Sequence, residues 1–364
     1  MCYYLLRMLY KWVYFLFIDR QNYILNYRSV FLEKNKKKSK LFLKICLFAL
    51  VCTLLGASKP HWGFWAHRRI NRLAVFRLPE EMQFFYKRNL DYLTENAVNP
   101  DRRRYAVIGE AERHFIDLDV YGDSALQKLP KYWPDAIKQV GEDSLRKHGI
   151  VPWHLQTAAF QLTEAFKAKD ARRILRLSAD LGHYVADAHV PLHTTKNYNG
   201  QLTNQEGIHA FWESRLPELF AEDYDLWIGE AAYLDQIQAE VWRVVAASHA
   251  ASDSVFVFEK ELTKTFDPDK KFSYELRNNV LTRTYSKEFS EKYHEMLKGQ
   301  VQRRMKASVK MVGDMWYTCW VNAGQPDLKA LSEFASGAQD KKEEAAEQQN
   351  WLRRLFYIRN ESDN

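Results

Sequence analysis

The sequence predicts an all-α protein with a single multi-helical domain. Apolar residues recur at helical spacing along most of the chain, and no run of alternating strands joined by hairpin turns stands out between them. Of the 364 residues, 46% are hydrophobic and 27% are charged, as in a globular protein. Residues 58–364 are close to the upper length that one hydrophobic core supports. We therefore expect one helical domain over residues 58–325, preceded by a leader and followed by a polar tail.

Residues 1–57 have the features of an export signal. They carry ten Lys or Arg and two Asp or Glu, a net charge of +8, which leaves a net charge of −1 for residues 58–364. The lysine-rich stretch 34–40 precedes the apolar stretch 41–57, which ends on the small residue Ala57 before a predicted cleavage site. Cleavage predicts a periplasmic or extracellular protein, whereas an uncleaved segment would act as a membrane anchor. Residues 1–32 lie upstream of the signal, as expected of a start codon assigned too early.

Helical segments are expected nearly throughout the domain, with loops between them. Two of them end before a proline, Pro79 or Pro191, because proline cannot continue a helix. Cys319 is the one cysteine after the leader, and its aromatic neighbours predict a buried thiol. The expected helices are Trp65–Phe76, His154–Ala168, Asp170–Ala188, Gly229–Ala251 and Ser286–Trp320, and the expected loops are Asn96–Arg103, Tyr121–Pro134, Thr194–Gly207 and Asp267–Lys271.

The tail, residues 326–364, is polar and charged. It closes with the segment Trp351–Arg359, in which aromatic residues are interleaved with arginines. Such a segment forms either a terminal helix that docks on the domain or a helix that lies in a membrane interface. The sequence leaves both interpretations open.

Histidine and carboxylate pairs give the strongest functional signal. Nine of the eleven histidines lie within residues 61–209. His183 and Asp187 are four residues apart in a predicted helix, so both side chains project from one face of that helix. His209 and Glu213 repeat this spacing. Each pair by itself is usually an exposed polar face or an ion pair.

Further histidines accompany the two pairs. His193 lies six residues after Asp187, just past a proline at which the chain can turn back. His114 lies thirteen residues after Asp101, and His67 lies in the first predicted helix. Imidazole nitrogens and carboxylate oxygens are typical zinc ligands, and this many polar groups would be costly to bury without a metal. The sequence therefore predicts a multinuclear metal site.

The order of these motifs resembles the zinc-dependent phospholipase C / S1–P1 nuclease superfamily. The resemblance covers residues 62–213, and beyond them only helical character is shared. It implies an all-helical secreted enzyme of the phospholipase C/P1 nuclease type, with three zinc ions in one cleft. The matching motifs are Trp62-Gly…His67, Asp101, His114-Phe-x-Asp117, His183-x3-Asp187-x5-His193 and His209-x3-Glu213.

The resemblance also implies which residues hold each zinc ion. Asp187 would be shared by two ions, and Asp101 matches the family's general base. The first zinc takes Asp101, His114, His183 and Asp187; the second takes His193, His209 and Glu213; the third takes His67, Asp187 and the α-amino nitrogen and carbonyl oxygen of Trp62. Asp117 and Asp119 either orient His114 by hydrogen bonding or serve as a helix cap or surface turn.

The third zinc site departs from the family pattern. In the family this tryptophan is the first residue of the mature enzyme, so its amine is free. Here Ser58–His61 lie between the predicted cleavage site and Trp62. Either a second protease removes these four residues, or the third zinc is held differently, with His61 as the alternative ligand.

Two enzymatic functions and one non-enzymatic function fit such a site. Paired zinc ions activate water and clamp the oxygens of a displacement at phosphorus, so the resemblance implies phosphodiester hydrolysis. A phospholipase C is favoured by Glu213 as the last ligand and by the near-neutral charge of residues 58–364, which argues against a broad basic face for polyanions. An S1/P1-like single-strand nuclease is the alternative, favoured by the extra His189. The third reading is a metal-binding protein without turnover that binds lipids or surfaces. No protein partner can be inferred.

Overall fold

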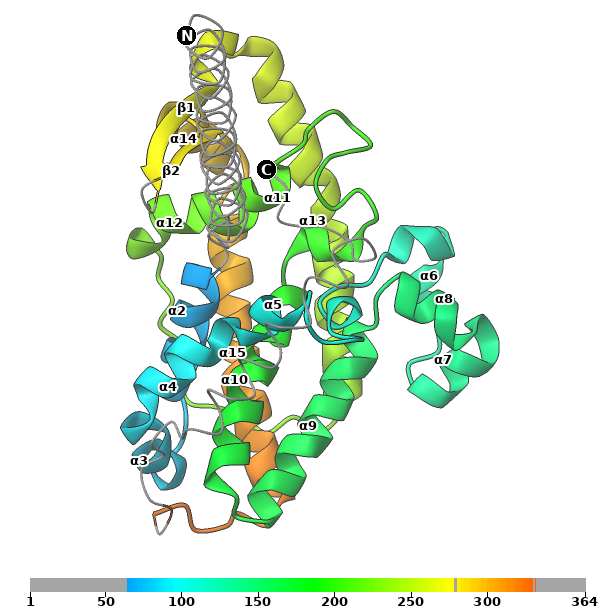
Figure 1. The fold of residues 1–364 in the computed structure, drawn as a ribbon, viewed down its shortest axis with the longest axis vertical. Helices are drawn as coiled ribbons and strands as arrows, with labels where there is room; N and C mark the ends of the chain where they lie inside the picture. The colour runs from blue at the N-terminus through cyan, green and yellow to red at the C-terminus, as the bar shows by residue number, and fades with distance from the viewer. Residues whose placement is uncertain (1–63, 278–279, 330, 332–364) are drawn as a thin grey trace, which may run out of the picture. The chain divides into compact units, whose positions relative to one another are not determined.

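The computed structural model describes residues 64–277, 280–329 and 331, which all belong to one compact unit. The predicted all-α class is confirmed, because helices make up most of this unit and a two-stranded hairpin is the remaining regular structure among the described residues (Figure 1). None of the helices described is long and apolar enough to span a membrane. The leader, Trp62 and the segment Trp351–Arg359 lie outside the described residues, so the predictions for them stay predictions.

The first half of the domain is built from short helices followed by two long ones. The short helices are α2 (Phe64–Val75), α3 (Glu80–Arg88), α4 (Leu90–Glu95), α5 (Asn99–Arg103), α6 (Ala125–Lys128), α7 (Trp133–Val140) and α8 (Glu142–Lys147), and the long ones are α9 (Val151–Lys167) and α10 (Ala171–Ala188). Turns of 3₁₀ helix join them at η1 (Asn96–Val98), η2 (Ala111–Arg113), η3 (Leu118–Tyr121) and η4 (Pro191–Thr194).

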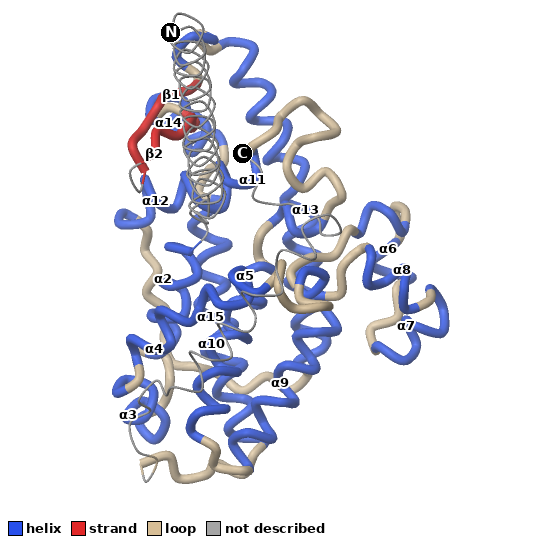
Figure 2. Tube along the Cα trace, viewed as in Figure 1, coloured by secondary structure: helices blue, strands red, loops and turns tan. Residues whose placement is uncertain are grey.

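The second half contains another pair of long helices and the hairpin. Its elements are α11 (Ile208–Ala210), the π-helical segment η5 (Phe211–Arg215), α12 (Leu216–Phe220), η6 (Ala221–Asp223), α13 (Ile237–Thr265), η7 (Pro268–Lys270), β1 (Phe272–Arg277), β2 (Val280–Tyr285), α14 (Lys287–Met296) and α15 (Gln300–Asn322). Figure 2 shows how few strand residues interrupt the helices and loops.

Three of the predicted helices are confirmed to within a few residues. They correspond to α2, α9 and α10, which are amphipathic and have clear end signals. The side chain of Asp170 caps α10 by accepting a hydrogen bond from the backbone N–H of Arg173. The loop expected over Thr194–Gly207 is also confirmed, because this segment contains turns but no helix or strand after η4.

Other expectations were wrong at particular residues. The expected helix Ser286–Trp320 is broken into α14 and α15, because Gly299 adopts a left-handed conformation with φ of +74°. The expected helix Gly229–Ala251 begins only at Ile237 and continues to Thr265. The expected loop Asn96–Arg103 forms η1 and α5, and the loops over residues 121–134 and 267–271 contain α6 and η7.

The hairpin was not expected at all. β1 pairs with β2 in antiparallel register, with Phe272 opposite Tyr285 and Leu276 opposite Leu281. Its base rests on the domain, because the ring of Tyr285 stacks on Phe211 with centroids 3.8 Å apart. A two-stranded hairpin is marginal in isolation, so this packing holds it in place.

Helix α10 lies at the centre of the main core. It packs against α9, α15, α2 and η1, and side chains such as Leu181, Val185 and Trp316 are fully buried there. Each large apolar side chain buried in this way stabilises the fold by about 1.5–3 kcal/mol. Cys319 is buried in the same core, as predicted. The core therefore fixes α10, the helix that carries the central pair of candidate ligands.

Candidate metal centre

Helix α10 presents the first pair of candidate ligands. His183 and Asp187 lie one turn apart, and Nε2 of His183 is 3.2 Å from Oδ2 of Asp187. Both side chains are buried. The helix therefore holds an imidazole and a carboxylate at one point inside the domain, as their spacing predicts.

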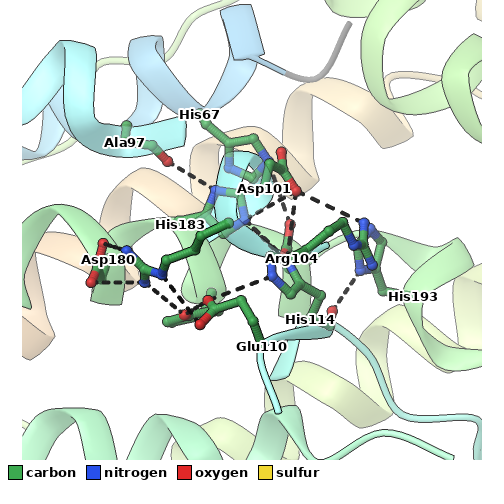
Figure 3. A network of polar contacts seen from close by, with 12 residues as sticks. His67, Ala97, Asp101, Arg104, Glu110, His114, Asp180, His183 and His193 are labelled. Carbon is green, nitrogen blue, oxygen red and sulfur yellow. Dashed lines mark hydrogen bonds and ion pairs between the residues drawn. The ribbon is translucent and has the colours of Figure 1, made fainter. Parts of the chain in front are cut away.

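Two earlier segments bring further ligands to this pair. Asp101 comes from α5, and His114 follows η2. Nδ1 of His114 lies 2.8 Å from Oδ2 of Asp187 and 3.1 Å from Nε2 of His183. Oδ1 of Asp101 lies 3.6 Å from the same His183 nitrogen and 3.7 Å from Nδ1 of His114. These four side chains form what we call the first group, of which Figure 3 labels Asp101, His114 and His183.

Helix α2 approaches α10 closely enough to bring His67 to the same place. The contact is at Gly182, where a Cβ atom would lie only 2.0 Å from Oδ1 of Asn71. The Asn71 amide donates a hydrogen bond to the carbonyl oxygen of Ala179 on α10 (3.1 Å). Asn71 lies one turn after His67, whose ring stacks on that of His183 with centroids 4.0 Å apart. A glycine at 182 therefore permits the approach that places His67 in the centre.

A second group consists of His193, His209 and Glu213. Oε2 of Glu213 is 2.8 Å from Nε2 of His209 and 3.4 Å from Nε2 of His193. The rings of the two histidines are 4.9 Å apart between centroids. Glu213 lies in the π-helical segment η5, a kind of segment that is frequent at functional sites. The ligand atoms of this group all lie within 4.8 Å of one another.

His67 lies between the two groups and faces a carboxylate from each. Its Nε2 atom is 3.4 Å from Oδ1 of Asp187 and 3.3 Å from Oε1 of Glu213. The second oxygen of Asp187 faces the first group, and the second oxygen of Glu213 faces the second group. The contact with Glu213 was not predicted. Each group therefore shares one carboxylate with His67.

Backbone carbonyl groups fix the orientation of three imidazoles. Because a neutral imidazole carries one proton, a donating Nδ1 leaves the lone pair on Nε2, which is the atom that faces the carboxylates. A lone pair directed at a carboxylate oxygen is repulsive unless a second proton or a metal cation lies between them. The arrangement therefore fits a metal. In each of the three hydrogen bonds an Nδ1 atom faces a backbone carbonyl oxygen. The pairs are His183 with Ala97 (2.9 Å), His193 with His114 (2.6 Å) and His209 with Tyr198 (3.2 Å).

The charges of the site stabilise one another when no metal is bound. Burial by itself raises the pKa of Asp187, but the charge of His183 lowers it well below its ordinary value. Burial lowers the pKa of His183, but the charges of Asp187 and Asp101 raise it to about 9. Burial also raises the pKa of Glu213, but its hydrogen bonds to histidines lower it well below its ordinary value. The carboxylates are therefore ionised at neutral pH, the state that binds a metal.

All predicted ligands that the structure describes are brought together. They are His67, Asp101, His114, His183, Asp187, His193, His209 and Glu213. Trp62 and His61 lie outside the described residues, so their roles at the third zinc stay predictions. These buried histidine, aspartate and glutamate groups can hold metal ions.

The two aspartates that follow His114 contact neighbouring loops. Asp119 accepts hydrogen bonds from the hydroxyl of Thr195 (2.8 Å) and the backbone N–H of Lys196 (3.0 Å). It therefore holds the segment that follows η4. Oδ2 of Asp117 is 3.7 Å from Nδ1 of His148.

Two charged residues at the site were missed in the sequence. Glu110 is buried, and its Oε1 lies 3.9 Å from Nε2 of His114. It precedes His114 by four residues, so the spacing that marked the other pairs was present here too. Arg104 is also buried, with Nη1 3.9 Å from Oδ1 of Asp101, and its side chain points toward the histidines (Figure 3).

Comparison with known proteins adds no further evidence. No protein-family model matches this chain, and no curated protein matches it. The resemblance noted above therefore depends on the order and spacing of the ligand motifs.

Proposed function

We propose that this chain is an exported zinc-dependent phosphodiester hydrolase of the phospholipase C / S1–P1 nuclease type that acts on phospholipids. The observation that carries the proposal is that Asp187 and Glu213 each face histidines on two sides. Carboxylates in such positions can hold metal ions next to one another, and adjacent ions act together on the attacking and leaving oxygens of one phosphodiester.

Zinc suits this mixture of imidazole nitrogens and carboxylate oxygens. When bound, zinc would lower the pKa of a water molecule and neutralise charge on the phosphate. His67 would serve the third ion together with both shared carboxylates and, where it is exposed as an N-terminus, Trp62. The first ion would be held by Asp101, His114, His183 and Asp187, and the second by His193, His209 and Glu213.

Asp101 and Arg104 are the residues that we assign to the chemistry itself. The side chain of Asp101 is 13% exposed and that of Asp187 is 2% exposed, so Asp101 is the more accessible of the two carboxylates. As a general base, the ionised Asp101 accepts the proton of the attacking water. The guanidinium group of Arg104 lies beside it and is suited to bind a phosphate oxygen and stabilise its growing negative charge.

Phospholipid is the preferred substrate because the domain offers little charge for a polyanion. The net charge of residues 58–364 is −1. His189, which favours the nuclease alternative, donates from Nδ1 to the carbonyl oxygen of Val185 (2.7 Å). Burial lowers the pKa of His189 to about 3, so this side chain is neutral at physiological pH and supplies no positive charge to nucleic acid.

Parallel assays on three substrates test this proposal. The purified protein, supplied with zinc, is given a generic phosphodiester, phosphatidylcholine and denatured DNA. We expect hydrolysis of the first two and release of phosphocholine, with little cleavage of DNA. Cleavage of DNA without lipid hydrolysis would assign the nuclease function instead. Tight zinc binding without any hydrolysis would favour the metal-binding protein without turnover.

A further inference from the structure

A cluster of charged and hydroxyl side chains lies beside the first group. Glu110 is its centre and is fully buried. The carboxylate of Glu110 accepts a hydrogen bond from the hydroxyl of Tyr184, and its Oε2 lies 3.2 Å from Nε of Arg103 and 2.9 Å from Nη1 of Arg113. Arg103 also donates to both oxygens of Asp180, at 3.2 and 2.9 Å (Figure 3).

Each member of this cluster is a close neighbour, in sequence, of a candidate ligand. Arg103 lies two residues after Asp101 on α5, and Glu110 lies four residues before His114. Asp180 and Tyr184 lie on α10, one turn apart, on the face next to the one that carries His183. The cluster therefore ties together the three segments that supply the first group.

His114 is oriented differently from the other histidines. Its Nδ1 atom faces the first group, and its Nε2 atom faces Glu110 at 3.9 Å. Among the residues described, no hydrogen-bond partner reaches Nε2. A ligating Nδ1 must keep its lone pair, so the ring proton has to reside on Nε2. A buried N–H group without an acceptor is costly, and Glu110 is the carboxylate whose negative charge faces it, at 3.9 Å.

We propose that Glu110 is a positioning residue for the metal of the first group. It stabilises the tautomer of His114 that carries its proton on Nε2, and through Arg103 and Tyr184 it holds α5 and α10 in place. This inference rests on the proposed function only in requiring that the first group binds a metal. Removing such a partner of a ligating histidine typically weakens metal binding by roughly 10–100-fold.

The test compares two variants of the full chain, in each of which one glutamate is replaced by glutamine. Glu110→Gln removes the charge that faces His114. Glu112→Gln is the matched control, because Glu112 lies in η2 and pairs with Arg146 on α8 (3.1 Å). Zinc affinities are measured by competition with a chromophoric chelator. We expect Glu110→Gln to weaken one zinc by roughly 10–100-fold and to leave the others unchanged, and Glu112→Gln to match the wild type.

A second variant, Tyr184→Phe, tests the inference where Glu110→Gln does not fold. Tyr184→Phe keeps the ring that packs beside His114 (centroids 5.4 Å apart) and removes only the hydroxyl that donates to Glu110. We expect a smaller loss of affinity at the same zinc, and a changed visible spectrum of the cobalt-substituted protein in both Glu110→Gln and Tyr184→Phe.

Two outcomes would overturn the inference and leave the proposed function standing. Equal zinc affinities in Glu110→Gln and Glu112→Gln, with only the metal-free Glu110→Gln protein less stable to heat, would show a structural ion pair. Where Glu110→Gln does not fold, wild-type zinc affinity and cobalt spectrum in Tyr184→Phe would overturn it. A wild-type chain that binds no zinc would refute the proposed function as well.

Discussion

Oε1 of Glu213 lies 3.3 Å from Nε2 of His67, while Oε2 of the same carboxylate lies 2.8 Å from Nε2 of His209. One side chain thus connects a histidine on α2 with a histidine more than a hundred residues later in the chain. Together with Asp187, it gives His67 two acidic neighbours. A metal beside His67 would therefore have two protein carboxylates available before any N-terminal group is considered.

Of the single substitutions at the site, replacement of Asp187 on α10 should reduce zinc binding and hydrolysis most. Asp187→Asn removes a charge that faces both His67 and the first group, whereas His67→Ala removes a ligand of the third zinc alone. We expect at least two zinc ions in the wild type, fewer in Asp187→Asn, and more residual hydrolysis in His67→Ala than in Asp187→Asn. The loss of zinc affinity in Asp187→Asn should exceed the roughly 10–100-fold loss that is typical when a hydrogen-bond partner of a metal ligand is replaced.

Metal analysis and turnover on a generic phosphodiester check this expectation. Asp170→Asn is the matched control, because Asp170 lies at the start of the same helix and caps it. Asparagine caps helices about as well, so this variant should behave as the wild type. Equal zinc content and equal turnover in Asp187→Asn and His67→Ala would contradict the shared position of Asp187.

The N-terminus of the mature protein should set the strength of the third zinc. If the chain begins at Ser58, the Trp62 nitrogen is an amide and cannot ligate, so the third zinc should bind weakly. If trimming exposes Trp62, its amine can join His67, and three zinc ions should bind tightly. The amine has an ordinary pKa of roughly 7.7–8.0 and must lose a proton to bind zinc, so the occupancy of the third zinc site should rise with pH.

The measurement is N-terminal sequencing of the mature protein together with a count of the zinc ions that it binds. Three tight zinc ions on a chain that begins at Ser58 would contradict this prediction and point to His61.

The close approach of α2 to α10 should depend on Gly182. In Gly182→Ala the new Cβ atom would meet Oδ1 of Asn71 at 2.0 Å, so the Asn71 amide must move away from its buried partners. We expect the free energy of unfolding to fall by about 1–3 kcal/mol and the zinc nearest His67 to bind more weakly. Urea denaturation and zinc counting check this. Gly229→Ala, where nothing lies within 4 Å, is the control. Equal free energies of unfolding in the two variants would contradict a close contact between Asn71 and Gly182.

His154 should make the stability of the metal-free protein sensitive to acid. Burial, together with the charge of Arg113, lowers the pKa of His154 to about 3, whereas the unfolded chain has a pKa near 6.5. Between these values the unfolded state binds a proton that the folded state does not. The free energy of unfolding should therefore fall as the pH falls from about 6.5 toward 3, by up to ~1.4 kcal/mol per pH unit.

The variant His154→Phe isolates this contribution. Phenylalanine keeps a ring against Tyr184, where the centroids are now 4.5 Å apart, and cannot take up a proton. Urea denaturation of the metal-free proteins at pH 6.5 and pH 4 should show a smaller loss of stability in His154→Phe than in the wild type. Parallel losses in the two proteins would show that His154 does not contribute.

Much of the site could be predicted because its spacing is local. His183 and Asp187 share a face of one helix, and the spacing of His209 and Glu213 likewise brought them together. Glu110 has the same spacing from His114, but the three residues between them form the 3₁₀ turn η2 rather than part of an α-helix, so no helical pattern drew attention to it. The network around it depends on where α5 and α10 lie, which is a property of the tertiary structure.

Contacts between distant segments could not be derived from the sequence. The second contact of Glu213 depends on the position of α2, which is set by Asn71 against Gly182. The hairpin was missed for a related reason. Its strands alternate weakly in polarity, and packing of Tyr285 on Phe211, rather than local propensity, holds its base.

Stepwise return of zinc to chelator-treated protein tests most directly whether these groups hold the ions that drive hydrolysis. The rate on bis(p-nitrophenyl) phosphate is followed as zinc is added to a known amount of metal-free chain. We expect no hydrolysis at the start, a rise with each equivalent, and a plateau at two or three zinc ions per chain. Hydrolysis that persists in the metal-free protein, or full zinc uptake without any hydrolysis, would contradict the account.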